Sequence, residues 1–210
     1  ITLVLCVFFT YHASHLYVTN DPLSYFPDDK PLIQEAQTIH EDLAGIKVFF
    51  IALEAENDKA FLEPENLRKI NKIQNFLAKQ AVFDTTLSVV DHLKYVNSQF
   101  QGEFSANKIP PTRQLVAQYL MFFHRSELES YISHDYRRAN IVVRHNISDS
   151  HTLNDYIDEL KDFANNISGD RITARVVGQN LLVNRAAEEL MISQIKALVL
   201  LLALIFVLMS

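Results

Sequence analysis

The sequence closes on an apolar run without a single charge, and no other feature constrains the fold as strongly. Residues 197–209 read ALVLLLALIFVLM, and residues 1–10, ITLVLCVFFT, form a second uncharged run. A helix that is apolar on every side is buried in a large core or lies in a membrane. A bilayer span needs roughly 20 apolar residues, so each run alone is too short. We interpret them as the outer half of one transmembrane helix and the first part of the next.

The first run differs from a signal peptide, because no basic segment precedes it and no small-residue cleavage site follows it. Two buried helices of a soluble protein are the alternative interpretation. If both runs enter a membrane, the residues between them share one side of it. The lack of lysine and arginine clusters beside the runs favours the extracytoplasmic side, although charge is a weak guide for so long a segment.

The composition is that of a folded domain, with 49% hydrophobic and 21% charged residues among 210. The net charge of -6 argues against a nucleic-acid partner, because phosphate binding requires clustered lysine and arginine. Cys6 is the single cysteine, so no disulfide can form within the chain.

A first β-α-β pattern spans residues 46–90. Residues 46–55, IKVFFIALEA, are short, apolar and rich in β-branched and aromatic side chains, which predicts a buried strand. Pro64 suits the first turn of a helix over residues 65–80. That helix has an apolar stripe at helical spacing, made of Leu67, Ile70, Ile73 and Leu77. Residues 82–90 are predicted to be the second strand.

A second β-α-β pattern occupies the last third. Apolar and polar residues partly alternate over residues 138–147, which predicts a strand with one buried face. Thr152 begins T-x-x-D, a variant of the capping box, before a second amphipathic helix. Residues 171–177 form the closing strand. Gly178 allows a turn into a continuous helix over residues 179–210.

The remaining segments connect these units. Three prolines make residues 17–31 an extended connector, and residues 33–43 are predicted to form a short helix. Residues 97–111 are polar and end in a double proline. Thr112 can cap a helix that runs to about His124, and another turn is expected over residues 126–132. Split β-α-β units of this kind commonly form small open-faced α/β sandwiches.

The order of these parts resembles the first extracytoplasmic (porter) domain of the resistance-nodulation-division (RND) superfamily, in its MMPL-like branch of hydrophobe and amphiphile exporters. The resemblance covers essentially the whole chain. It is carried by NDPLSYFP at residues 20–27, FLEPENL at 61–67, SVVDHLK at 88–94, IPPT at 109–112, QYL at 118–120 and VGQNL at 177–181. Each motif is weak alone, and their order and spacing are more specific.

The resemblance implies an α/β (α+β) fold with two ferredoxin-like, porter-type β-α-β subdomains. The implied boundaries are 1–16 for the end of the first membrane helix, 17–98 for the first subdomain with its connector, 99–178 for a helical linker and the second subdomain, and 179–210 for the long helix entering the membrane. The implied protein is an ion-gradient-driven exporter of lipids or other amphiphiles in the inner (cytoplasmic) membrane, with this domain on the periplasmic side.

In that family the proton-carrying carboxylates lie in later membrane helices, so this domain is expected to receive or pass the substrate. The implied partners are the membrane, a hydrophobic or lipid-like substrate, the second porter domain and membrane helices of the same protein, and a second copy of the chain. No cofactor is implied.

The sequence also offers three groups of titratable residues: His12 and His15 with Asp21, His134 with Asp135, and His145 with Asp149. Two histidines three residues apart can bind a metal on a helix, but an interfacial pair of polar aromatic side chains is the commoner arrangement. The other two groups resemble acid–base pairs. No nucleophile motif accompanies them, because Ser88, Ser126 and Ser133 lack the G-x-S-x-G turn. We therefore predict no catalytic residue and no metal site.

An aromatic group is the most suggestive surface for a lipid-like ligand, which needs apolar, concave walls. Its members are Phe100, Phe104, Tyr119, Phe122 and Phe123. The simpler interpretation is that Tyr119, Leu120 and Phe123 are the core face of a helix, so no substrate-binding residue is assigned.

Two tripeptides, Asn146-Ile147-Ser148 and Asn166-Ile167-Ser168, match the glycosylation pattern, which is frequent by chance. The alternative function is a ligand-sensing domain of a receptor with two membrane spans. The protein segment after residue 210 would distinguish the two, because a receptor continues into an output domain and a transporter into further spans.

Overall fold

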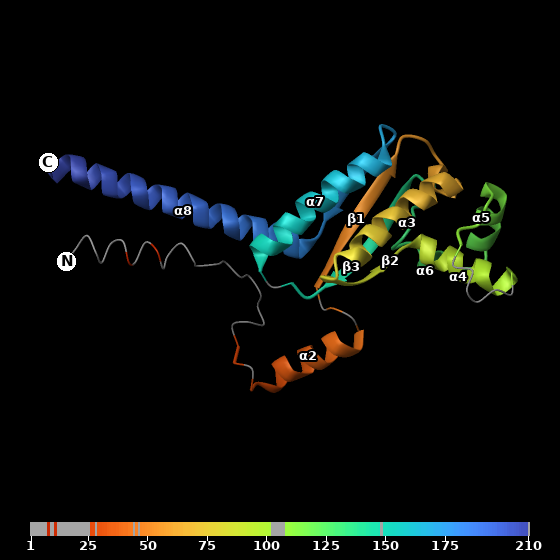
Figure 1. Ribbon diagram of the computed structural model, residues 1–210, viewed down its shortest axis with the longest axis horizontal. Helices are drawn as coiled ribbons and strands as arrows, with labels where there is room; N and C mark the ends of the chain where they lie inside the picture. Colours follow the sequence, from red (N-terminus) through yellow and green to blue (C-terminus); the bar gives the residue numbers. More distant parts are fainter. Residues whose placement is uncertain are drawn as a thin grey trace.

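The computed structural model describes residues 8, 11, 26–27, 29–43, 45, 47–101, 108–147 and 149–209. Its body is a four-stranded sheet with helices packed on it, and one long helix leads from this body to the C-terminal end (Figure 1). The elements are α2 (Pro31–Leu43), β1 (Lys47–Ala55), η2 (Ala60–Leu62), α3 (Pro64–Lys79), β2 (Phe83–Leu87), α4 (Val89–Gln101), α5 (Arg113–Leu120), α6 (Arg125–Leu128), β3 (Arg138–His145), α7 (Ser150–Ser168), β4 (Ile172–Val177) and α8 (Gln179–Met209). The predicted N-terminal membrane helix and most of the predicted connector lie outside the described residues.

The strands lie in the order β2-β3-β1-β4, and every neighbouring pair is antiparallel. The predicted α+β class is confirmed, as are strands at the positions of β1, β3 and β4. The two β-α-β patterns do not form separate sheets, however, because their strands interleave in one sheet. The two strands of each unit are parallel and leave a gap of one strand, which a strand of the other unit fills. The most apolar strands, β1 and β3, thereby occupy the centre.

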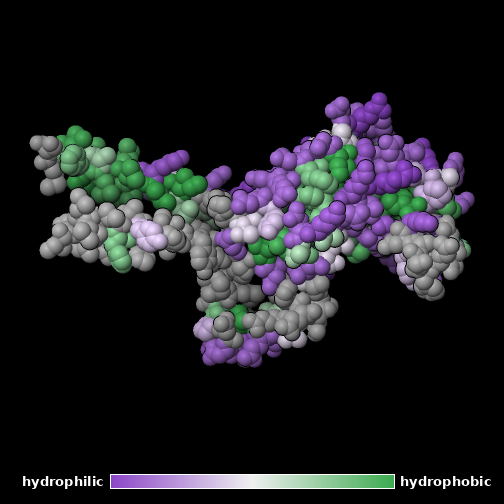
Figure 2. All heavy atoms as spheres, viewed as in Figure 1, coloured by the Kyte–Doolittle hydropathy of each residue, from purple (hydrophilic) through white to green (hydrophobic). Residues whose placement is uncertain are grey.

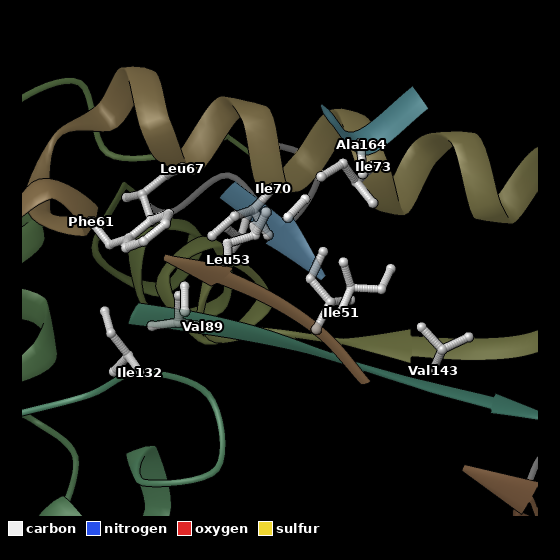
Figure 3. Close-up of a cluster of buried hydrophobic side chains, with 14 of the residues drawn as sticks. Ile51, Leu53, Phe61, Leu67, Ile70, Ile73, Val89, Ile132, Val143 and Ala164 are labelled. Atoms are coloured by element: carbon white, nitrogen blue, oxygen red, sulfur yellow. The ribbon is translucent and has the colours of Figure 1, made fainter. Parts of the chain in front are cut away.

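The hydrophobic core lies between the sheet and the helices α3 and α7, which pack side by side on one face of it (Figure 1). Alternate residues of β1, including Ile51 and Leu53, are completely or almost completely buried. Leu53 points toward Ile70 of α3, and Ile51 lies further along β1, as Figure 3 shows. The predicted apolar stripe of α3 is confirmed, because Leu67, Ile70, Ile73 and Leu77 are all buried.

The residues at the start of α3 and of α7 explain where these two helices begin. Pro64 is the first residue of α3, where a missing backbone N–H costs nothing. Helix α7 begins one turn earlier than the predicted T-x-x-D box. Asp149 is its N-cap, and the Asp149 carboxylate accepts a hydrogen bond from the backbone N–H of Thr152 at 2.9 Å. A carboxylate is at least as good a cap as threonine and is favoured by the helix dipole, so Asp149 takes the position.

The predicted strand over residues 82–90 is wrong in its last part. Strand β2 ends at Leu87, and Val89 and Val90 are buried in the first turn of α4. Helix α4 continues to Gln101, across part of the segment predicted to be a polar break. The cap predicted at Thr112 is confirmed, because its hydroxyl accepts a hydrogen bond from the N–H of Leu115 at 3.3 Å.

Candidate functional site

Helix α8 starts in the folded body and continues outward as a long helix with an apolar surface. It runs without a break over 31 residues, about 46 Å at the usual rise per residue. Its segment Leu181–Leu208 is long and apolar enough to cross a membrane, and it is the one such helix among the described residues. Figure 2 shows apolar residues gathered along the outer part of α8, whereas the visible surface of the body is mostly hydrophilic. The predicted continuous helix is therefore confirmed as far as Met209.

The inner end of α8 is fixed to the sheet by close packing. A Cβ atom on Gly178 would lie 2.9 Å from Cβ of Phe49 in β1, so only glycine lets the chain pass this close. Leu182 donates its backbone N–H to the Gly178 carbonyl at 3.2 Å, and the helix starts there. Leu181 is then buried in the core beside α7 and β4. The first turn of α8 is thus part of the body.

An ion-pair cluster joins α8 to α7 one turn further on. Arg185 of α8 lies 3.3 Å from the Asp158 carboxylate, and Lys161 donates to the same oxygen at 2.7 Å. The hydrogen bond from Lys161, together with the charges of Lys161 and Arg185, lowers the pKa of Asp158. The Asp158 side chain is 66% exposed, so the cluster orients the two helices more than it stabilises them.

A cavity of about 110 Å³ lies where α7, β4 and α8 meet. Its lining includes apolar Ile157, Val176 and Leu181 and cationic Lys161 and Arg185. Pockets that enclose whole ligands are several times larger. This cavity is therefore a gap at the joint rather than a site for an intact lipid.

His145 is the buried titratable group nearest to this joint, at the end of β3. Its Nδ1 accepts the backbone N–H of Ile147 at 3.2 Å, which leaves the proton of the neutral ring on Nε2. Nε2 has no hydrogen-bond partner within the described residues. Burial, and to a smaller extent the charge of Lys47, lowers the pKa of His145 to about 4. The predicted partner, Asp149, instead caps α7.

The second predicted acid–base pair also separates into unrelated contacts. The Asp135 carboxylate accepts hydrogen bonds from the Ser133 hydroxyl at 2.5 Å and from the backbone N–H of Arg137 at 3.1 Å. The hydrogen bond from Ser133 is the main reason that the pKa of Asp135 is lowered. His134 is exposed next to it. The contacts of Asp135 with Ser133 and Arg137 therefore stabilise the loop before β3.

Ser88 has a structural role at the start of α4. Its hydroxyl accepts the N–H of Val90 at 3.1 Å and donates to Oε1 of buried Gln74 at 3.0 Å. The Asp91 carboxylate accepts the N–H of Ser88 at 2.8 Å and a side-chain N–H of Gln74 at 2.7 Å. Ser88-x-x-Asp91 is therefore a working capping box, tied to α3 through Gln74.

The aromatic group is divided between core and surface. Tyr119 is buried, and its hydroxyl donates to the Asn97 side chain at 3.2 Å. Phe100 stacks on Tyr119 with ring centroids 5.6 Å apart, yet Phe100 and Phe122 each remain 63% exposed. The core-face interpretation is confirmed for Tyr119 and Leu120, whereas Phe123 is only partly buried. Helices α4 and α5 lie at the end of the body away from α8 (Figure 1).

Several predicted candidates lie outside the described residues: His12, His15, Asp21, Phe104 and Ser148. Of the glycosylation patterns, Asn146 and Asn166 are exposed, and Ser168 is buried at the end of α7. Among the described residues no three His, Cys, Asp or Glu side chains are grouped closely enough to hold a metal ion.

A polar hollow of about 660 Å³ lies between the end of β1 and the start of α3. Lys59, Arg68 and Arg171 line it together with Asp58 and Glu63. With Lys69, Arg113 and Glu65 the lining has five cations and three carboxylates in all, so the hollow has mixed charge with a cationic excess.

No known family model matches the chain, and no curated protein matches it either. The site is therefore defined by its own geometry, which is a folded body fixed to the first turns of a long apolar helix. Sequence reasoning identified Gly178 as a turn but missed the Arg185–Asp158 contact. These two residues are 27 positions apart, and no local pattern relates them.

Proposed function

We propose that this chain is an extracytoplasmic domain of a membrane transporter of the RND type, in the MMPL-like branch that exports lipids and other amphiphiles. The observation that carries the proposal is α8, which begins in the core of an α+β body and continues as an exposed apolar helix. The domain would lie on the periplasmic side of an inner membrane, and an ion gradient across that membrane would drive export.

The strand order supports this proposal. The order β2-β3-β1-β4, with α3 and α7 on one face, corresponds to a split β-α-β arrangement of the ferredoxin-like kind. The chain forms one such unit, whereas the resemblance implies two, and fold analogy alone does not determine function. Sequence segments that carry the resemblance also fall at structural joints, such as Ser88 at the start of α4 and Gly178 before α8.

The role implied for the chain is mechanical. Packing at Gly178 and the contact between Arg185 and Asp158 make the inner turns of α8 one unit with the body. A tilt of the helix in the membrane would therefore move the whole domain. Alternating access by rocking of such units is common among transporters. Substrate would be received or passed outside the membrane while the energy-coupling groups lie in other spans.

The test uses the full-length protein in proteoliposomes with a fluorescent fatty acid as the probe. We expect probe movement to rise when a proton gradient is imposed and to collapse when the gradient is dissipated. Gly178→Val should slow gradient-driven movement at unchanged protein level, because the added atoms separate α8 from Phe49. Gly169→Ala, at the far end of α7, is the matched control. Movement that is indifferent to the gradient would contradict the proposal.

The second candidate is the sensory domain of a two-span receptor, which the same continuous α8 favours, because a rigid helix also transmits a signal. The two are separated by the parent gene. Closely spaced further spans after residue 210 support the transporter, and a soluble output domain supports the receptor.

A further inference from the structure

The face of the sheet opposite α3 and α7 has a continuous apolar row. The register pairs Leu87 with Val142, Val142 with Phe50, and Phe50 with Val177, so the row crosses all four strands. Leu87 is 39% and Val177 46% exposed, and the two central side chains are half-buried. A contiguous apolar row that reaches the surface is a candidate contact surface.

Arginine side chains flank this row on the same face. Arg144 lies two residues beyond Val142 on β3, and Arg175 lies two residues before Val177 on β4. Side chains two residues apart on a strand share a face and are about 7 Å apart. Arg175 is exposed and makes no ion pair with any described residue. The open face thus presents an apolar centre with positive charge on each side.

A hollow of about 600 Å³ lies over part of this face, so the groove has a side wall as well as the sheet as its floor. Phe50, Ala52 and Val177 belong to its floor, and residues 129–134 line its side. Arg125 and Arg138 also border it, against the single carboxylate of Glu129. An amphipathic helix with acidic residues beside its apolar stripe has the shape and the charge for such a groove.

Helix α2 of the same sequence has these properties. Its residues, PLIQEAQTIHEDL, include three acidic side chains and no lysine or arginine. Ile39 is 49% exposed, and exposed Glu35 lies one turn before it on the same side of the helix, about 6 Å along the axis.

Helix α2 lies apart from its own sheet, and Gly45 is packed closely before β1. Gly45 is buried with φ +83°, and a Cβ there would lie 2.7 Å from Oδ2 of Asp84 and 2.9 Å from the backbone nitrogen of His145. Gly45 is therefore packed against the ends of β2 and β3. In Figure 1, α2 lies apart from the body. Its exposed side is free for another molecule rather than for its own sheet.

We propose that the open face of the sheet binds α2 of a second copy of this chain, with Ile39 on the apolar row and Glu35 beside Arg175. The exchange is reciprocal, because each copy has one face and one helix. Reciprocal contacts of this type close a two-fold dimer. The proposal does not depend on what the protein transports or senses.

Disulfide trapping in the full-length protein tests this arrangement. Cys6 and any other cysteine are first replaced by serine. A chain with Ile39→Cys and one tag is then co-expressed with a chain with Val177→Cys and another tag. Oxidation should link the two tags, because a disulfide forms only when the Cα atoms come within about 7 Å. Lys79→Cys, exposed at the end of α3, replaces Val177→Cys in the control and should give no link.

Charge reversal makes the test specific. Arg175→Glu or Glu35→Arg alone should lower the linked fraction about threefold or more, and the two together should restore it. Both side chains are exposed, so the melting temperature of each variant should stay that of the parent. The proposal is overturned if no link joins the two tags, if the disulfide forms only when both cysteines are in one chain, or if charge reversal leaves the linked fraction unchanged.

Discussion

The body and the outer part of α8 use the same apolar side chains in opposite ways. Leu67 and Leu77 in α3 are completely buried, whereas Leu202 and Leu204 in α8 are more than half exposed. Exposed leucine on every side of a helix is strongly unfavourable in water and favourable in hydrocarbon. The contrast shows that the body completes its own core without α8 beyond the first turns. Under the proposed function, the rest of α8 is matched to lipid.

A matched pair of substitutions gives the largest expected difference between the two regions. Leu67→Ala should lower the free energy of unfolding of the body by about 2–5 kcal/mol, because it leaves a cavity in a fully packed core. Leu202→Ala should change it by less than about 0.5 kcal/mol. Urea unfolding of the detergent-solubilised protein, followed by circular dichroism, measures both. Equal losses would mean that the outer part of α8 packs on the body.

Acid should act on the body and spare the outer helix, since residues 197–209 have no titratable group. The pKa of His145 is lowered to about 4 in the fold from 6.5, so the folded ring stays neutral while the unfolded chain takes up a proton. This stability is present above pH 6.5 and is lost as the pH falls from 6.5 toward 4, by at most about 3 kcal/mol. His145→Gln should flatten this part of the pH profile of unfolding. An unchanged profile would show that folding does not lower the pKa of His145.

Gly178 is the residue at which the body joins α8, so its substitution should loosen the packing of α8 on the body. Gly178→Ala places a Cβ 2.9 Å from Cβ of Phe49 and should cost about 1–3 kcal/mol of stability. Spin labels at Asp162 on α7 and Leu190 on α8 should report a broader distance distribution. Gly169→Ala adds backbone strain at φ +70° without a steric neighbour, so it should leave that distribution narrow. Equal broadening would contradict a specific joint at Gly178.

The ion-pair cluster at the same joint should have the smallest effect. Asp158→Asn should cost about 0.2–1 kcal/mol, because the carboxylate is largely exposed and salt screens it. The pKa of Asp158 is lowered, so the contribution is present at neutral pH and is lost as the pH falls through that lowered pKa. A double-mutant cycle with Arg185→Ala measures the coupling. A coupling that survives high salt would point to a more buried contact than the structure has.

Local sequence patterns were sufficient for most elements and failed where two patterns overlapped. Strands β1, β3 and β4 and helices α3 and α7 have strong periodicity, and their positions were predicted. Residues 82–90 look like one apolar strand, but the capping box Ser88-x-x-Asp91 divides them between β2 and α4. The similar pattern at Thr152 is inactive because Asp149, three residues earlier, caps α7 instead.

The arrangement of the sheet and of the candidate site could not be predicted in the same way. Strand order depends on contacts between distant segments, such as Phe50 with both Val142 and Val177. The sequence shows alternation in each strand but not which strand is its neighbour, so the interleaving of the two units was missed. The long apolar helix could be predicted because its composition is a local property of the sequence. Its contact with Asp158 joins residues that are distant in the sequence, so it could not be predicted in this way.

The most direct test of the account is the accessibility of two leucines of α8 in intact cells. In the full-length protein without other cysteines, Leu182→Cys and Leu202→Cys are treated separately with a membrane-impermeant maleimide. The side chains of Leu182 and Leu202 are both more than half exposed, so only the medium around them can make their labelling differ. The account predicts rapid labelling of Leu182→Cys from outside the cell and none of Leu202→Cys until detergent is added. Equal labelling of both positions in intact cells would contradict it.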